Sequence, residues 1–282
     1  PTIEQMGGLV ALQGYEGGAP HKSGISYGDP IAGATCAAAI VSGLLYRERN
    51  GTGCYSVLPQ RDGVTGLVGE FMVAESLGWP MDYRIGNGGH GSTPHNVYPC
   101  KPDLNPRKVL GSDRYPMSEV FDRWLAIDCR TNEEWRSLIE VIADPRLFQS
   151  KYNALSARES DSEKIDEIIS DWTSRLNADE TASLLQSHGI NASAVQTALL
   201  LLSDSHLEKR NNFISVSHDE VGIHKTARPT WRLSNRPKLP ALSSPLFGAH
   251  NEEILHELGY SPEKILEMSQ TGAISTELIG AR

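Results

Sequence analysis

An aspartate at the expected start of a helix is the first residue whose type and position could carry chemistry. The sequence runs Gly28, Asp29, Pro30, and an Asp at the N-cap followed by a Pro at the first helical position is a typical helix start. Unpaired backbone N–H groups and the positive end of the helix dipole keep such a carboxylate ionised and hold it in one orientation, as a carboxylate nucleophile requires. Because Asp is also a preferred structural N-cap, its position alone favours a structural role over a catalytic one.

A glycine-rich loop is the second candidate. It consists of Gly86, Asn87, Gly88, Gly89, His90 and Gly91. The spacing matches G-x-G-x-x-G, but no apolar strand precedes it and Pro94 would block the helix that should follow, so a dinucleotide site is not expected. Two interpretations remain open: a loop that closes over an active site with its backbone N–H groups facing a ligand, or a flexible linker.

Other catalytic motifs are missing from the sequence. His90 and His95 are five residues apart, and neither HExxH nor a Cys/His quartet occurs, so we expect no metal site. The G-x-S-x-G turn of serine hydrolases and the G-x-x-x-x-G-K-[ST] phosphate loop do not occur either. We expect no tightly bound cofactor.

The composition excludes several classes of partner. The chain has 282 residues, with 26 Lys and Arg against 35 Asp and Glu, for a net charge of −9. An acidic surface repels phosphate backbones, so nucleic acid is not expected as a partner. No stretch approaches the roughly 18 apolar residues of a membrane span, which predicts a cytoplasmic protein without a membrane partner. The spacing of the four cysteines fits no disulfide framework, which indicates reduced thiols, with Cys36 in the core.

The pattern of apolar and turn residues predicts alternating helices and strands after an irregular start. Residues 1–22 are expected to form a loop with at most one short strand. We expect helices over 30–49, 64–77, 131–141, 160–175, 178–188, 251–258 and 262–269, and strands over 55–58, 124–129 and 190–195. Small and apolar residues fill the first helix, which is typical of a buried helix packed on a sheet. The alternation indicates an α/β protein with an inserted α+β unit.

The order and spacing of three segments resemble one family, the class III CoA-transferases of the formyl-CoA transferase and carnitine CoA-transferase group. The first segment runs from GDPIAG at 28–33 to RERNGTG at 47–53, and looks like the family's D-x-x-A-G helix ending in R-x-x-x-G-x-G. The second joins Arg84 and the glycine loop to Tyr98 and the strand at 124–128. The third is SPLFGAHN at 244–251 with the helix after it. The similarity covers nearly the whole chain and corresponds to the C-terminal two-thirds of a family chain.

The resemblance implies a fold and a mechanism. The expected fold is α/β, with a partial Rossmann-like large domain, an inserted small α+β domain and two subunits interlocked like links of a chain. It implies that Asp29 attacks an acyl-CoA thioester to give a mixed anhydride, then an aspartyl-CoA thioester that a small carboxylic acid attacks. Coenzyme A thioester is then a substrate, and the glycine loop shields the intermediates from water while its N–H groups bind developing oxyanions.

On this basis we expect four regions. They are part of the large domain with the catalytic helix at 1–80, a linker with the glycine loop at 81–95, the small domain at 96–205, and a return to the large domain at 206–282. Family chains extend well upstream of the aspartate, through strands that supply most contacts to the CoA nucleotide. We therefore expect that part to come from a fused segment or from a second chain, in a homo- or hetero-oligomer.

Two other functions stay open. One is an α-methylacyl-CoA racemase, which has the same fold and pairs an aspartate at this position with a histidine that would lie before Pro1. The other is a structural subunit without catalytic activity, which completes a partner chain; the intact Asp29 argues mildly against it.

Overall fold

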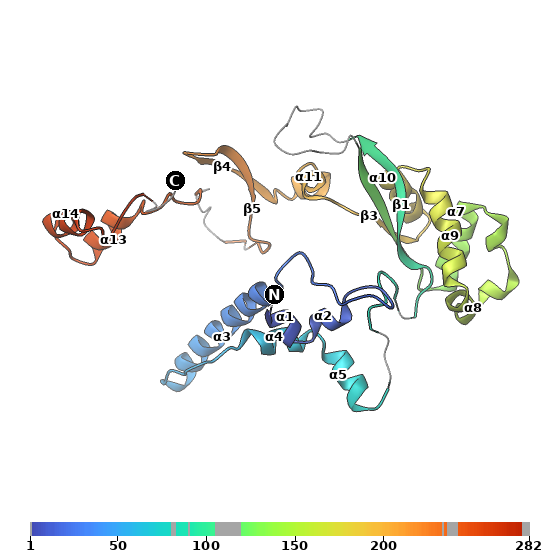
Figure 1. The fold of residues 1–282 in the computed structure, drawn as a ribbon, viewed down its shortest axis with the longest axis horizontal. Coiled ribbons are helices and arrows are strands. Elements are labelled where there is room, and N and C mark those ends of the chain that lie inside the picture. The colour runs from blue at the N-terminus through green and yellow to red at the C-terminus, as the bar shows by residue number, and fades with distance from the viewer. Residues whose placement is uncertain are drawn as a thin grey trace. The chain divides into compact units, whose positions relative to one another are not determined.

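The computed structural model describes residues 2–79, 83–89, 91–104, 120–232, 234–235 and 242–277. The chain divides into two compact units, Pro1–Val195 and Gln196–Arg282, and each is considered by itself (Figure 1).

The first unit begins with helices rather than a loop. These are α1 (Thr2–Met6), α2 (Leu9–Leu12), α3 (Gly28–Asn50), α4 (Gln60–Gly66) and α5 (Gly69–Ser76). The close approach of α1 to α4 explains the glycine at 7, where an added Cβ would lie 2.7 Å from the Val64 side chain. The expected loop at 1–22 is therefore wrong in part, residues 55–58 form no strand, and the helix expected over 64–77 is split into α4 and α5.

The long helix α3 begins two residues earlier than its sequence signals indicate. Tyr27 is the N-cap residue, and its backbone N–H donates to the buried Glu4 carboxylate, which takes the place of a capping side chain. Asp29 therefore lies in the first helical turn and not at the N-cap. The C-terminal end is as expected, because Gly51 adopts a left-handed conformation there and its N–H bonds the Arg47 carbonyl.

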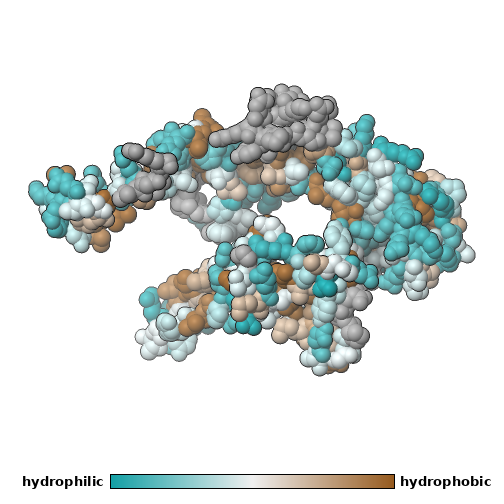
Figure 2. All heavy atoms as spheres, viewed as in Figure 1, coloured by the Kyte–Doolittle hydropathy of each residue, from teal (hydrophilic) through white to brown (hydrophobic). Residues whose placement is uncertain are grey.

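The surface of α3 is largely uncovered in this chain, contrary to the expectation of a buried helix. Only Gly28 is buried, whereas Ile40 is 58% and Val41 57% exposed, and Cys36 is exposed as well. Figure 2 shows hydrophobic surface along this helix. Its length and composition would suffice to cross a membrane, which the sequence had not led us to expect, but the core helix of a globular protein meets the same criterion.

A three-stranded antiparallel sheet forms the centre of residues 95–194. Its strands are β1 (His95–Leu104), β2 (Val120–Asp128) and β3 (Asn191–Ala194), in the order β1-β2-β3. Helices cover one face: α7 (Asn132–Ile142), α8 (Leu155–Ser160), α9 (Ser162–Thr173) and α10 (Ala178–Ser187), with the short turns η1 (Pro145–Leu147) and η2 (Ser150–Asn153) between α7 and α8. Figure 1 shows these helices grouped beside the sheet.

The core of this region follows from strand alternation. On the helix-covered face, Tyr98, Leu125 and Ile127 are at most 2% exposed and pack with Trp135 and Leu138 of α7. The expected strand at 190–195 and helices at 131–141, 160–175 and 178–188 are confirmed to within two residues at each end, and the strand expected at 124–129 is confirmed but begins four residues earlier.

The second unit is a β-hairpin with short helices. Its elements are α11 (Ala198–Leu201), α12 (Ser205–Lys209), β4 (Phe213–His218), β5 (Gly222–Ala227), α13 (Asn251–Glu257) and α14 (Pro262–Gln270). The two helices expected near the C-terminal end are confirmed, and β4 and β5 pair antiparallel. The protein is thus of mixed α/β class, with small sheets.

Candidate active site

The Asp29 carboxylate is exposed in the first turn of α3 and accepts a hydrogen bond from a side chain of α4. Gln60, the first residue of α4, donates from Nε2 to Asp29 Oδ1 over 3.2 Å. The two helices approach closely, because a Cβ added at Gly63 of α4 would lie 3.2 Å from the Ile31 side chain. Within the described part of the chain Oδ2 accepts no hydrogen bond, so this oxygen is accessible to a substrate.

The start of α3 is held by the neighbouring helix α1. Glu4 is 2% exposed, and its Oε1 accepts the backbone N–H of Tyr27. Gly28 packs against Ile3, to whose side chain an added Cβ would lie 3.2 Å away. A buried carboxylate and close packing therefore fix the helical turn that carries Asp29.

The glycine loop is attached to the N-terminal segment at one end. The Gly86 N–H donates to the Gly14 carbonyl over 2.9 Å, and Gly86 has a φ of +65°. A Cβ added at Gly86 would also lie 2.7 Å from the Tyr15 ring, so the backbone conformation and the close packing each require a glycine at this position. His90 lies outside the described residues.

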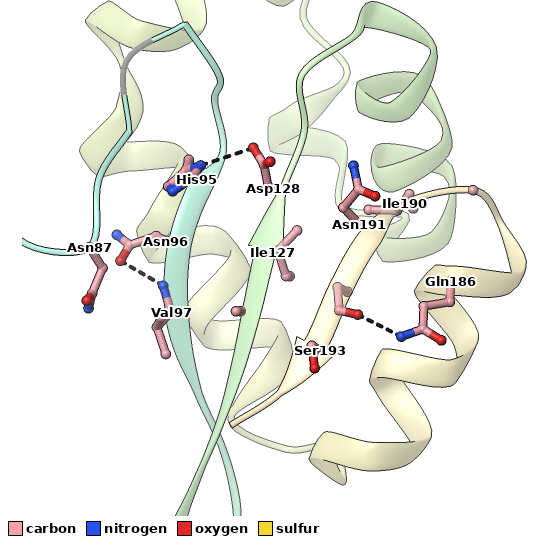
Figure 3. A pocket seen from close by; sticks show the side chains of 13 residues that line it. Asn87, His95, Asn96, Val97, Ile127, Asp128, Gln186, Ile190, Asn191 and Ser193 are labelled. Carbon is pink, nitrogen blue, oxygen red and sulfur yellow. Dashed lines mark hydrogen bonds and ion pairs between the residues drawn. The ribbon is translucent and has the colours of Figure 1, made fainter. Parts of the chain in front are cut away.

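A cavity of about 630 Å³ lies at the end of the three-stranded sheet and borders this loop (Figure 3). Asn87 of the loop lines it together with residues of all three strands and the end of α10. The lining residues are Asn87, His95, Asn96, Val97, Ala126, Ile127, Asp128, Gln186, Gly189, Ile190, Asn191, Ala192 and Ser193. A strand follows the loop instead of a helix, in agreement with the rejection of a dinucleotide motif.

A histidine–aspartate pair stands in this cavity. His95 Nδ1 is 3.0 Å from Asp128 Oδ1 and 3.1 Å from Ser92 Oγ, and Arg130 Nε donates to Asp128 Oδ2 over 2.7 Å. Burial by itself raises the pKa of Asp128, but the hydrogen bonds from Arg130, His95 and Ser92 outweigh this and leave that pKa below its usual value. The Asp128 carboxylate is therefore ionised near neutral pH.

A buried arginine fixes the segment between the glycine loop and His95. Arg158 is 1% exposed and donates to the Thr93 carbonyl at 3.0 Å and the Tyr152 carbonyl at 2.8 Å. It also stacks over Trp135 at 5.3 Å from the ring centroid. These contacts hold the chain leading into β1, and with it the backbone of His95.

The structure brings together part of the predicted site. Asn87, Gly88 and Gly89 line a second cavity of about 450 Å³ that also contains His95. Asp29 is not among the residues that line either cavity. His95 and Asp128 were not predicted as site residues from the sequence. Their positions at the facing ends of two strands, which antiparallel pairing makes neighbours, are the signal that identifies them.

Metal coordination has no support in the described residues, among which no group of three or more His, Cys, Asp or Glu side chains is placed to hold an ion.

The fold and the sequence together define the class of protein. The structure resembles that of a CaiB/BaiF family protein from Brucella suis, with a TM-score of 0.72, 20% identity and coverage of 91% of this chain and 61% of that one. The sequence matches CoA-transferase family III over residues 1–106 and 107–251. The chain therefore belongs to CoA-transferase family III, and the resemblance noted from its motifs is confirmed.

Two relatives illustrate its place in the family. The chain is 27% identical over 268 residues to the succinyl-CoA–D-citramalate CoA-transferase of Chloroflexus aurantiacus, covering 95% of this chain and 62% of that protein. It is 26% identical over 288 residues to the formyl-CoA:oxalate CoA-transferase of Streptomyces coelicolor, covering 97% and 66%. The chain thus spans slightly under two thirds of the length of these relatives.

Proposed function

We propose that the chain is the part of an acyl-CoA:carboxylate CoA-transferase that carries the nucleophile, Asp29. The observation that supports this most strongly is the family match over residues 1–251, which includes the helix start that carries Asp29. The two relatives named above are transferases for D-citramalate and oxalate, which favours a dicarboxylic acid as the acceptor here. We place the reaction in the cytoplasm.

In the proposed reaction an Asp29 carboxylate oxygen attacks the thioester carbonyl of acyl-CoA. The C–S bond breaks, CoA leaves as thiolate, and a mixed anhydride forms. The thiolate then attacks the Asp29 carbonyl, which releases the donor acid and gives an aspartyl-CoA thioester. The acceptor carboxylate attacks this thioester and expels the thiolate again. The thiolate finally attacks the acyl carbon of the second anhydride, and Asp29 is regenerated as a carboxylate.

The geometry of Asp29 is suited to this role. The hydrogen bond from Gln60 is to Oδ1 of an exposed carboxylate, and the N-terminal backbone N–H groups of α3 lie in the same turn. Because both anhydrides hydrolyse in water, the glycine loop has a role in closing the site and binding developing oxyanions. No tightly bound cofactor is required for these steps.

We propose further that Asp29 and the glycine loop meet in a larger assembly. The apolar surface of α3 would be covered there by a Rossmann-like large domain, completed by a second chain or by a continuous segment that supplies the CoA-binding part. An interlocked dimer is the arrangement we favour. The exposed Ile40 and Val41 support this, since a globular protein rarely leaves such a helix bare.

The first experiment is the Asp29→Asn variant of the complete assembly. With succinyl-CoA as donor and dicarboxylic acids, oxalate and D-citramalate included, as acceptors, turnover should fall by at least about a thousandfold, because an amide cannot form the anhydride. The melting temperature should change little, because the loss of one charge in an exposed first turn is worth about 0.5 kcal/mol. The matched control is Asp62→Asn in the first turn of α4, which should retain full turnover.

Full turnover by Asp29→Asn would refute the nucleophile assignment. If the wild-type assembly forms but transfers no CoA, α-proton exchange on a branched acyl-CoA would indicate the racemase. An assembly with neither activity would indicate a structural subunit.

A further inference from the structure

A row of three polar side chains crosses the end of the sheet. In the strand register His95 faces Asp128, and Asp128 faces Asn191. Because strand side chains alternate, this row lies on the face opposite Tyr98 and Leu125, away from the helices. Figure 3 shows the three residues around the cavity, one from each strand.

The hydrogen bonds of the row leave one ring nitrogen of His95 unused. An ionised carboxylate only accepts, so the contact with Asp128 places a proton on Nδ1. Ser92 lies beside this same nitrogen, which excludes the relay of a serine hydrolase, where the serine and the aspartate must contact different ring nitrogens. Within the described residues Nε2 makes no hydrogen bond.

Among the described residues that line this cavity, His95 is the side chain that can carry a positive charge and so bind an anion. The single carboxylate in the lining, Asp128, is already neutralised by Arg130, whose Nε is 2.7 Å away. Asn191 donates to Glu134 and Gln186 donates to the Ala192 carbonyl, so these amides are held in place by the protein. The volume of about 630 Å³ is in the range of small-molecule sites.

The glycine loop is packed against the same ring. A Cβ added at Gly89 would lie 2.7 Å from His95 Cγ and 2.9 Å from its Nδ1. The ring orientation and the loop position therefore depend on each other.

We propose that His95, protonated on both ring nitrogens, donates from Nε2 to the non-reacting carboxylate of a dicarboxylic acid in this cavity. This inference rests on the proposed CoA transfer. Because Asp29 does not line the cavity, a carboxylate held by His95 is not the one that reacts. A substrate held at both places must carry two acid groups, one at the nucleophile and one at His95. His95 thus determines the preference for dicarboxylic over monocarboxylic acids.

The test compares succinate with butyrate, which has the same number of carbons and one carboxylate fewer. The complete assembly is titrated with each acid by calorimetry, as wild type and as His95→Phe, which keeps a planar ring beneath Gly89 but removes both nitrogens. Succinate should bind wild type at least about tenfold more tightly than butyrate, as a charge-assisted hydrogen bond would give, and His95→Phe should abolish the difference. His95→Gln retains a neutral donor, so its preference for succinate over butyrate should lie between those of wild type and His95→Phe. It also provides a second variant if His95→Phe does not fold.

The matched control is His224→Gln, an exposed histidine on β5 of the other unit, which should leave the preference unchanged. A succinate preference of equal size in His95→Phe, or equal binding of the two acids by wild type, would overturn the inference.

Acylation of Asp29 by acyl-CoA alone, detected by hydroxylamine trapping and mass spectrometry, separates this inference from the proposed function. If wild type and His95→Phe are both acylated but the succinate preference does not depend on His95, only the carboxylate site is refuted. If succinate binds through His95 and Asp29 is not acylated even in wild type, the site stands as an acid-binding site and the transfer mechanism is refuted.

Discussion

At the scale of single residues, the position of Asp29 is the central feature. Its carboxylate is exposed, lies at the positive end of a 23-residue helix, and receives one side-chain hydrogen bond from the residues that the structure describes, that of Gln60. Tyr27 is the N-cap residue, and its N–H donates to Glu4, so Asp29 does not occupy the capping position. This weakens the structural explanation for an aspartate at this position.

Gln60 is expected to position the nucleophile. Gln60→Met keeps the length of the side chain but removes the donor, so the Asp29 carboxylate can rotate. Loss of one neutral hydrogen bond should slow acylation of Asp29 by about tenfold with little change in the KM for acyl-CoA. Rapid-quench measurement of acyl-enzyme formation tests this, and Gln60→Glu provides a contrast because it places a like charge beside Asp29. Unchanged acylation in Gln60→Met would show that the hydrogen bond does not position the carboxylate.

At the scale of elements, helix ends and strand pairing determine where site residues lie. Thr131 caps α7 in a complete capping box with Glu134, and α7 packs under the strand that carries Asp128. Thr131 and Glu134 stand three positions apart in the sequence, which is the spacing of this motif. Arg158 and the strand register then place His95 opposite Asp128.

Thr131→Ala should lower the free energy of unfolding by about 1 kcal/mol, the usual value of a lost N-cap. Thr131→Ser should retain most of the stability because its hydroxyl can still accept the Glu134 N–H. Chemical denaturation of the three proteins measures the difference. Equal stability of wild type and Thr131→Ala would contradict the contribution assigned to the box.

The sequence was informative where local signals decide the structure. The predicted range of α7 and the predicted C-terminal end of α3 agree with the structure to within one residue, and the buried run at 124–129 identified β2 except for its first four residues. The sequence did not predict the features that depend on tertiary contacts. Helix α1 is too short to show a periodic pattern, and the Glu4 cap of α3 comes from 23 residues away along the chain. The pair of His95 and Asp128, separated by 33 positions, depends on strand register in the same way.

At the scale of the whole molecule, the exposed apolar surface of α3 is the main departure from expectation. The sequence indicates a buried helix, and in this chain Val41 and its neighbours are exposed. The burial of α3 by additional protein that we propose would account for both observations. The chain spans 62% and 66% of the two relatives compared, so their length leaves room for such a covering region.

Val41→Asp should therefore prevent assembly while leaving the stability of the region around β1–β3 intact. Multi-angle light scattering should show the assembled species reduced at least about tenfold in population, since a buried unpaired charge costs several kcal/mol. The control is Ser187→Asp, a charge added to the exposed end of α10. Normal assembly by Val41→Asp would contradict the covering of α3.

The most direct test of the account follows the oxygen atoms. The acceptor acid that supports turnover is labelled with oxygen-18 in both oxygens of its reacting carboxylate and supplied to the complete assembly with acyl-CoA. When the acceptor attacks the aspartyl thioester, one of its labelled oxygens becomes the bridging oxygen of the anhydride. The thiolate then attacks the acyl carbon, and this labelled oxygen stays on Asp29 at each turnover. Mass spectrometry of the peptide that contains Asp29 should show this oxygen-18. Sustained turnover with no label on Asp29 would contradict the role of Asp29 as the nucleophile.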